Sequence, residues 1–225
     1  MTMKRHIVIG DIHGCFDELR ELLDRVAPSG DDVVVSAGDV VRKGPAPDLC
    51  LDLWRARGWD AVLGNQERKL LDLVKAKRVS DEPDQRVANR RELLDFIREW
   101  PLLLDFEEAG FAVVHGGLMP GTSMRDTLDD SVLTLRYIRR AGEGWTIVPK
   151  RQEQPGDRFW TEEWDGPRTI VYGHTPRPEV RRDAKAIGLD TACVYGGSLS
   201  AAILKDGEWT IEAVKARRQY AQPAM

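Results

Sequence analysis

The sequence predicts an α/β protein, in which short buried strands alternate with amphipathic helices along most of the chain. Short apolar runs, the first at residues 7–9, are followed by segments with apolar residues at helical spacing. Several of these runs also end in a glycine-flanked polar motif, beginning with Gly10-Asp11-Ile12-His13-Gly14. Because open α/β folds carry their chemistry at the carboxyl ends of their strands, a functional site is expected there.

Length and composition favour one compact domain covering residues 1–225. The chain has 225 residues, of which 42% are hydrophobic, and this is enough to bury one substantial core. No apolar run approaches membrane-spanning length, and the N-terminus leads into a strand without a signal-peptide pattern. The three widely spaced cysteines predict reduced thiols and a cytoplasmic protein, with Cys15 as a small core residue. A net charge of −4 argues against a general polyanion-binding surface.

The first half of the chain predicts strands that alternate with helices. Apolar spacing predicts a helix at 16–26, and a second at 47–57 that ends at Gly58. Two further helices, at 67–79 and 85–100, form an all-helical excursion between sheet segments. The strands of this half are predicted at 7–9, 33–35 and 61–63.

The second half reads mainly as strands. Residues 102–106 and 111–114 predict a hairpin, and 199–204 with 208–214 predict another across a Lys205-Asp206-Gly207 turn. Further strands are expected at 170–172 and 186–190. A short helix is expected at 131–140, an irregular stretch at 141–168, and a frayed tail at 217–225.

Five predicted strands end in residues that can bind a metal ion. An isolated Asp-x-His motif is equally compatible with an ordinary turn, but five such strand ends in one chain predict a built site. Three of the four histidines of the chain belong to this set, and His6 reads as an ordinary residue of the first strand. The predicted ligands are Asp11, His13, Asp39, Asn65, His115 and His174.

This ligand set predicts two divalent metal ions. Asp39 can bridge them, with Asp11 and His13 completing one site and Asn65, His115 and His174 the other. Mixed nitrogen and oxygen ligands suit Mn²⁺ best, with Fe or Zn²⁺ as alternatives. Paired cations hold a bridging hydroxide for in-line attack on phosphorus, so the predicted reaction is metal-dependent hydrolysis of a phosphate ester or anhydride.

These motifs resemble the calcineurin-like metallophosphoesterases, and within them the phosphoprotein-phosphatase branch. The resemblance rests on the Gly-Asp-Ile-His-Gly motif, Gly38-Asp39, Gly64-Asn65, His115-Gly116-Gly117 and Gly173-His174-Thr175, which follow the family's order. The closing Gly-Leu-Asp-Thr-Ala-Cys-Val-Tyr-Gly-Gly (188–197) and the Trp-Asp-Gly-Pro at 164–167 look like the diadenosine-tetraphosphatases. The resemblance implies two facing mixed β-sheets flanked by helices, the four-layer sandwich of the family. It also implies that Glu67 orients a neighbouring group.

Two departures from the family pattern bear on the substrate. The family usually has aspartate and arginine where this chain has Arg42 and Lys43, and histidine where it has Gln66. In the family that aspartate and histidine together protonate the leaving group. Since general acid catalysis contributes about 10²–10⁴-fold, its loss should affect alkyl phosphomonoesters more than anhydrides. A water or another side chain could instead donate the proton.

The expected substrate is therefore a small nucleoside polyphosphate such as diadenosine tetraphosphate, with capped RNA ends as a related possibility. Asp39, Asn65 and Lys43 are predicted to be catalytic, and Arg42, Lys43 and Arg136 to bind substrate phosphates. A protein phosphatase acting on phosphoserine, phosphothreonine or phosphotyrosine is the alternative, and a binding module without activity is a third. The sequence leaves the oligomeric state open.

Overall fold

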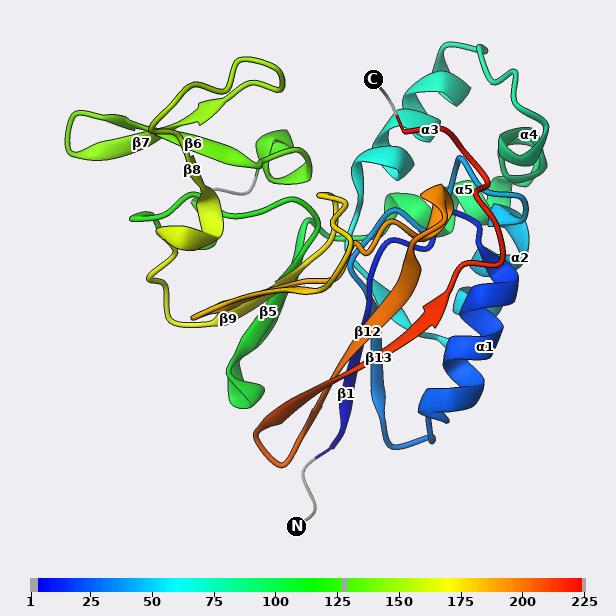
Figure 1. The fold of residues 1–225 in the computed structure, drawn as a ribbon. Helices are drawn as coiled ribbons and strands as arrows, with labels where there is room; N and C mark the ends of the chain where they lie inside the picture. The colour runs from blue at the N-terminus through cyan, green and yellow to red at the C-terminus, as the bar shows by residue number, and fades with distance from the viewer. Residues whose placement is uncertain (1–3, 127–128, 224–225) are drawn as a thin grey trace.

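Two mixed five-stranded sheets face each other in the computed structural model, which describes residues 4–126 and 129–223 (Figure 1). The first sheet has the order β13-β12-β1-β2-β3. In it β1 is parallel to β2, β2 is parallel to β3, and β12 runs antiparallel to both β1 and β13. Its strands are β1 (His6–Ile9), β2 (Val33–Ser36), β3 (Asp60–Ala61), β12 (Ser198–Lys205) and β13 (Glu208–Lys215).

The second sheet is also mixed and five-stranded, with the order β10-β11-β9-β5-β4. Here β5, β9 and β11 are parallel, and antiparallel strands form both edges. Its strands are β4 (Leu103–Phe106), β5 (Phe111–Val114), β9 (Thr169–Tyr172), β10 (Arg181–Asp183) and β11 (Ala186–Gly188). The expected α/β class and the pair of facing mixed sheets are thus confirmed.

Helices pack outside the first sheet and at one end of it. Figure 1 shows α1 (Phe16–Val26) and α2 (Pro47–Arg57) beside this sheet, with a helical segment above them. That segment, between β3 and β4, consists of α3 (Asn65–Lys75), α4 (Glu82–Ala88) and α5 (Arg91–Arg98). In the part of the chain that the structure describes, short 3-10 helices occur at Glu107–Ala109, Asp130–Leu133, Trp160–Glu162 and Cys193–Tyr195.

Strand alternation divides the core into two parts. In β1, Ile7 and Ile9 belong to the cluster that includes the helices, whereas Val8 belongs to the cluster between the sheets. In β5, Phe111 and Val113 likewise join the cluster between the sheets. Because successive side chains of a strand point to opposite faces, fully apolar strands of this kind are buried on both sides.

Two sequence predictions in the second half are wrong. The helix expected at 131–140 is a 3-10 turn followed by β6 (Tyr137–Ala141), which pairs with β7 (Gly144–Val148). Gly142, with φ +61°, supplies the turn between them, and the aromatic and β-branched residues at the start of β6 favour a strand. The stretch expected to be irregular contains β7 and β8 (Arg158–Phe159). These strands form a three-stranded sheet, β7-β6-β8, beside the second main sheet (Figure 1).

Two further expectations from the sequence also differ from the structure. The helix expected at 85–100 is divided into α4 and α5, because Arg90 is extended and forms the N-cap of α5. The tail expected to fray is docked as far as the structure describes it. Tyr220 donates its hydroxyl to Glu18 and its backbone N–H to Val194. Residues 224–225 of the predicted tail lie outside the described residues.

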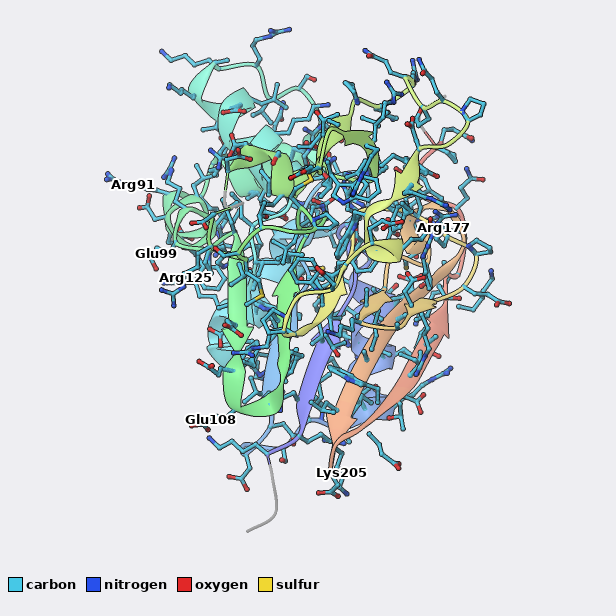
Figure 2. The ribbon with its side chains drawn as sticks, turned by 90° about the vertical axis from the view of Figure 1, so that its left-hand side faces the viewer. Arg91, Glu99, Glu108, Arg125, Arg177 and Lys205 are labelled. Carbon is cyan, nitrogen blue, oxygen red and sulfur yellow. The ribbon has the colours of Figure 1, made fainter. Side chains whose placement is uncertain are left out.

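Charged side chains cover the outside of the molecule. Figure 2 shows Arg91, Glu99 and Lys205 extending away from the sheets and helices. Within residues 4–126 and 129–223, no helix combines the length and the apolar character needed to cross a bilayer.

Candidate metal centre

The six residues predicted as metal ligands lie together at the carboxyl ends of parallel strands. Asp11 and His13 follow β1, Asp39 follows β2, and Asn65 follows β3 as the first residue of α3. From the other sheet, His115 follows β5 and His174 follows β9. Since parallel strands end at the same edge, both sheets deliver their loops to one place.

His13 faces the carboxylates of Asp11 and Asp39. Its Nδ1 lies 3.2 Å from the backbone oxygen of Val41, which is the arrangement of a ring N–H donating to a carbonyl. Its Nε2 lies 3.8 Å from Oδ2 of Asp11 and 3.6 Å from Oδ2 of Asp39. Such a backbone hydrogen bond fixes the tautomer that leaves the Nε2 lone pair directed at the carboxylates.

His115 repeats this arrangement from the second sheet. Its Nδ1 lies 2.8 Å from the carbonyl oxygen of Ala37, and its Nε2 lies 2.9 Å from Oδ1 of Asn65 and 3.3 Å from Oδ1 of Asp39. Nδ1 of His174 is also 2.9 Å from Oδ1 of Asn65. The two oxygens of Asp39 therefore face different histidines, His13 through Oδ2 and His115 through Oδ1.

The donor set fits divalent transition-metal ions. A histidine nitrogen lone pair surrounded by carboxylate and amide oxygens is repulsive unless a cation or proton lies between them. Burial lowers the pKa of His115 to about 4 and lowers that of His13 well below its usual value, so both rings are neutral near pH 7. Neutral imidazole and carboxylate are the forms that bind Mn²⁺, Fe or Zn²⁺.

The backbone at this site is held in conformations that most residues avoid. His13, Asp39 and His174 have φ values of +48°, +53° and +69°, in the left-handed region. Each such residue costs on the order of 1–3 kcal/mol, which the surrounding structure must offset. Glycine is needed where these loops touch, because a Cβ at Gly64 would collide with Asp39, and one at Gly173 with the Asp11 carboxylate.

Glu67 connects two of the loops that carry candidate ligands. This wholly buried carboxylate accepts hydrogen bonds from the backbone N–H groups of Val41 through Oε1, and of Asp39 and Gly64 through Oε2. Burial, with the nearby Asp39, raises the pKa of Glu67 to about 7. Glu67 thus has the geometry of a positioning residue.

A cavity of about 600 Å³ opens onto the candidate ligands. Besides Asp11, His13, Asp39, Asn65 and His174, its lining includes four cationic side chains. Lys43 and Arg136 come from loops next to the ligands, Lys69 from α3, and Lys150 from the segment after β7. Nζ of Lys43 is 3.0 Å from Nε2 of His13, and the Arg136 guanidinium donates to the backbone oxygen of His174 at 3.3 Å.

Arg42, predicted to bind substrate phosphate, pairs with a carboxylate outside this cavity instead. It does not belong to the cavity lining, and its Nε lies 3.1 Å from Oδ2 of Asp84 on α4. Side-chain exposure is only 16% for Arg42 and 2% for Asp84, so this is a largely buried ion pair. Gln66, by contrast, lines the cavity and donates its backbone N–H to Oδ1 of Asp39.

Asp190 is a buried site residue that the sequence reasoning missed. It follows β11 as the other candidate ligands follow their strands, and it lines the same cavity. Burial raises the pKa of Asp190 to about 6, and its Oδ1 accepts a hydrogen bond from the backbone of Ala192. An apolar run ending in a polar residue, the signal used for the other five strands, is present here too.

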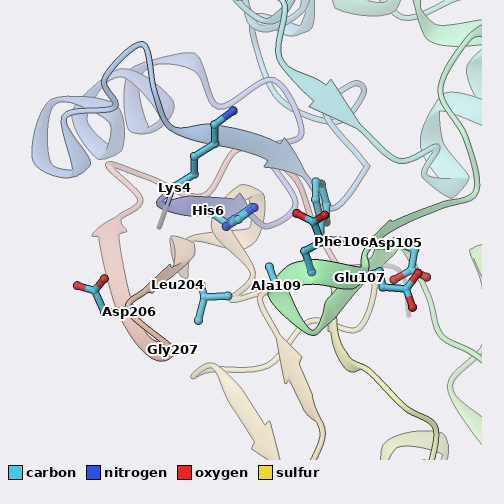
Figure 3. A pocket seen from close by; sticks show the side chains of 10 residues that line it. Lys4, His6, Asp105, Phe106, Glu107, Ala109, Leu204, Asp206 and Gly207 are labelled. Carbon is cyan, nitrogen blue, oxygen red and sulfur yellow. The ribbon is translucent and has the colours of Figure 1, made fainter. Parts of the chain in front are cut away.

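His6 lies at the other end of β1, beside a second cavity of about 790 Å³ (Figure 3). Its ring packs edge-on against Phe106 and Phe111, with centroid distances of 5.5 and 5.2 Å. His6 is the first residue of β1, in agreement with its expected place as an ordinary residue of the first strand.

Comparison with known proteins agrees with this geometry. The model of the calcineurin-like phosphoesterase family matches residues 4–209. The chain is 30% identical to the symmetrical bis(5'-nucleosyl)-tetraphosphatase of Chromohalobacter salexigens, covering 93% of this chain and 98% of that protein. It is 31% identical to the Vibrio parahaemolyticus protein of the same name, covering 86% and 92%.

A solved structure is similar along nearly the whole chain. It is described as a candidate diadenosine tetraphosphatase, and it superimposes with a TM-score of 0.84 at 33% identity, covering 95% of this chain and 94% of the other. The family model, the relatives and the arrangement of the two sheets all agree. The chain belongs to the calcineurin-like phosphoesterases and is a metal-dependent phosphohydrolase.

Proposed function

We propose that this protein hydrolyses the phosphoanhydride bonds of nucleoside polyphosphates such as diadenosine tetraphosphate. The observation that carries the proposal is that four cationic side chains line the same cavity as the candidate metal ligands, namely Lys43, Lys69, Arg136 and Lys150. A single phosphate monoester needs fewer positive groups than a chain of phosphates does. The names of the relatives described above support the same substrate class.

The proposed cofactors are two divalent ions, with Mn²⁺ as the preferred metal. Asp11, His13 and Asp39 would hold one, and Asp39, Asn65, His115 and His174 the other. When bound, such a pair supplies an activated water and neutralises charge on the phosphoryl oxygens. Asp39 belongs to both sets because its two oxygens face different histidines.

The protein's own residues would bind and orient the substrate. Lys43 and Arg136 lie nearest the candidate ligands, so they would hold the phosphate that is attacked. Lys69 and Lys150, on separate segments of the cavity wall, would hold phosphates farther along the chain. Arg can grip a phosphate with two parallel hydrogen bonds, whereas each Lys acts as a point charge.

The residues at positions 42 and 66 indicate which kind of leaving group the site can release. The Gln66 amide does not ionise near neutral pH, so it cannot protonate a leaving group as a histidine would. Arg42 forms an ion pair with Asp84 and does not line the cavity, so it cannot take the place of the family's aspartate there. A nucleotide phosphate departs as a stable anion and needs little protonation, whereas a serine alkoxide does need it. Anhydrides are therefore the substrates that this set of residues would serve best.

Product analysis with the Mn²⁺-loaded protein tests the proposal. Diadenosine tetraphosphate plus one water should give two molecules of ADP if cleavage is symmetrical, or ATP and AMP if it is asymmetrical, and either result supports the proposal. Asp39→Asn should abolish turnover in the same assay. Release of inorganic phosphate from a phosphopeptide, with the dinucleotide left intact, would instead support the alternative protein phosphatase.

A further inference from the structure

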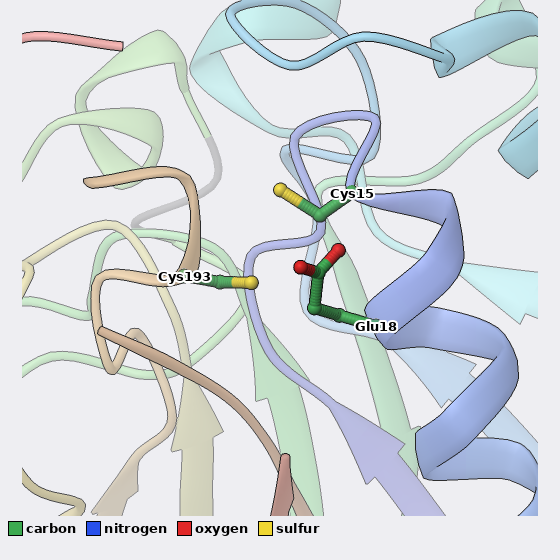
Figure 4. A group of neighbouring side chains, drawn as sticks. All are labelled: Cys15, Glu18 and Cys193. Carbon is green, nitrogen blue, oxygen red and sulfur yellow. The ribbon is translucent and has the colours of Figure 1, made fainter. Parts of the chain in front are cut away.

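A second cluster of potential metal ligands lies behind the turn that follows β1. Figure 4 shows Cys15 from this turn, Glu18 from α1 and Cys193 from the loop before β12 approaching one another. One ligand atom from each of these three buried residues lies within 4.8 Å of the other two. None of the three belongs to the candidate metal centre described above.

Only one of the two oxygens of the Glu18 carboxylate accepts hydrogen bonds from the part of the protein that the structure describes. Its Oε1 accepts hydrogen bonds from the backbone N–H of Arg217 at 2.9 Å and from the hydroxyl of Tyr220 at 2.7 Å. Its Oε2 is buried and has no hydrogen-bond partner among the described residues. A buried carboxylate oxygen without a partner is costly, which points to a ligand that the protein chain does not itself supply.

The two thiols complete the arrangement. Cys15 and Cys193 are both buried free thiols, and their sulfur atoms lie within 4.8 Å of each other. A metal ion binds thiolates by displacing their protons, and here two protons would leave, one from each sulfur. Two sulfur ligands select Zn²⁺ and similar ions over Mn²⁺, which prefers oxygen and nitrogen.

We propose that Cys15, Cys193 and Glu18 form a buried thiolate site for one ion of the Zn²⁺ class, separate from the candidate dinuclear centre. Such an ion would join the turn carrying Asp11 and His13 to α1 and to the loop that follows Asp190. Through Oε1 of Glu18 it would also fix the C-terminal segment. Its role is therefore to hold in place two of the loops that border the candidate centre.

Cobalt substitution distinguishes this site from the candidate centre. Thiolate ligation to Co²⁺ gives a sulfur-to-metal charge-transfer band in the near ultraviolet, and the candidate centre contains no sulfur ligand. Metal-free protein titrated with Co²⁺ should develop this band at one equivalent per chain. Protein loaded with Zn²⁺ should contain one Zn²⁺ ion per chain that weak chelators remove more slowly than the remaining bound Zn²⁺.

Single substitutions identify the ligands. Cys193→Ser should abolish the band and lose one equivalent of tightly held Zn²⁺, and Glu18→Gln should weaken that binding while keeping the contact with Tyr220. Cys50→Ser is the matched control, since Cys50 is also a buried free thiol but lies outside the cluster, and it should keep the band.

Three results would overturn the proposal. One is absence of the band in folded, fully reduced wild-type protein at saturating Co²⁺. Another is loss of the band in Cys50→Ser, which would assign the sulfur ligands differently. The third is a thiol titration of the purified, denatured protein that finds one free thiol instead of three, because Cys15 and Cys193 would then be a disulfide.

Discussion

The Glu67 carboxylate accepts a hydrogen bond from the backbone N–H of Asp39, with 2.8 Å between nitrogen and Oε2. The same oxygen accepts from Gly64, and Oε1 accepts from Val41. One buried side chain therefore fixes the loop after β2 against the loop after β3. Because Asp39 and Asn65 occupy these loops, the spacing of the candidate ligands depends on a residue that is not a ligand itself.

Glu67→Gln should weaken metal binding without unfolding the protein. The amide NH₂ of glutamine would face a backbone N–H where an oxygen now accepts, so the two loops would separate. Changes in such supporting groups typically cost about 10–100-fold in metal affinity. Isothermal titration with Mn²⁺ measures this. Glu92→Gln, on the exposed face of α5, is the control, and equal affinities for the two variants would refute the role of Glu67.

Arg42→Asp should destabilise the protein strongly. It would leave the buried Asp84 carboxylate facing a second carboxylate, and removing one partner of a buried pair costs about 3–5 kcal/mol. The double variant with Asp84→Asn should recover much of the loss. Urea unfolding measures the free energy of unfolding of the single and the double variant. A stable Arg42→Asp protein would show that the pair is not structurally important.

This pair also matters for any attempt to change the substrate. Introducing the family's aspartate and histidine at positions 42 and 66 requires Asp84→Asn as well. In that stable background, Gln66→His with Arg42→Asp should raise phosphopeptide hydrolysis selectively, by up to about 10²-fold if a proton donor is restored. No gain, with anhydride cleavage retained, would contradict the leaving-group argument.

Lys69→Ala should raise the KM for diadenosine tetraphosphate by at least about tenfold, because a hydrogen bond to a charged group contributes about 1.5–3 kcal/mol. The KM for a small aryl monophosphate should stay the same, because that substrate does not reach Lys69. Lys75→Ala, at the far end of the same helix and outside the cavity lining, is the matched control. A parallel rise for both substrates would place Lys69 at the attacked phosphate instead.

Asp39→Asn should stabilise the metal-free protein at neutral pH. Burial raises the pKa of Asp39 to about 6, above its value of about 4 in an unfolded chain, so the penalty for its ionisation develops between about pH 4 and pH 6 and is complete above pH 6. The advantage of asparagine, on the order of 1–3 kcal/mol at pH 7.5, should shrink below pH 6 and disappear near pH 4, below which the carboxyl is protonated in both states. Thermal unfolding of wild type and Asp39→Asn, measured at several pH values in the presence of a metal chelator, tests this trend.

Added Mn²⁺ should reverse the order of the two proteins. The ionised carboxylate is then a ligand, so wild type should gain more stability than Asp39→Asn at pH 7.5. An Asp39→Asn protein that gains as much from Mn²⁺ as wild type does would exclude Asp39 from metal binding.

The candidate centre could be predicted from the sequence because each ligand lies within a few residues of the end of a strand. The apolar run at 7–9 and the motif at 10–14 specify both the sheet edge and the side chains placed on it. Asp190 follows β11 in the same way, but a lone aspartate after a short strand is equally typical of an ordinary turn. Its burial beside Lys43 and Asp39 becomes clear only in three dimensions.

Other features depend on tertiary contacts that no local pattern encodes. The segment 131–140 has apolar residues at helical spacing, yet β6 forms because β7 and β8 both pair with it. The C-terminal segment has a polar composition, yet it docks because Glu18, far away in the sequence, accepts hydrogen bonds from it. Arg42 follows Asp39 closely, but its direction is decided by Asp84 on a distant helix.

The ratio of kcat/KM for diadenosine tetraphosphate to that for a phosphopeptide tests the central claim most directly. It should be measured with Mn²⁺-loaded wild type, with Asp39→Asn as the blank. The cationic cavity and the absence of a histidine at position 66 predict a ratio well above one, at least about 10²-fold. A ratio below one would contradict the claim and make the protein a phosphoprotein phosphatase with a proton donor still to be found.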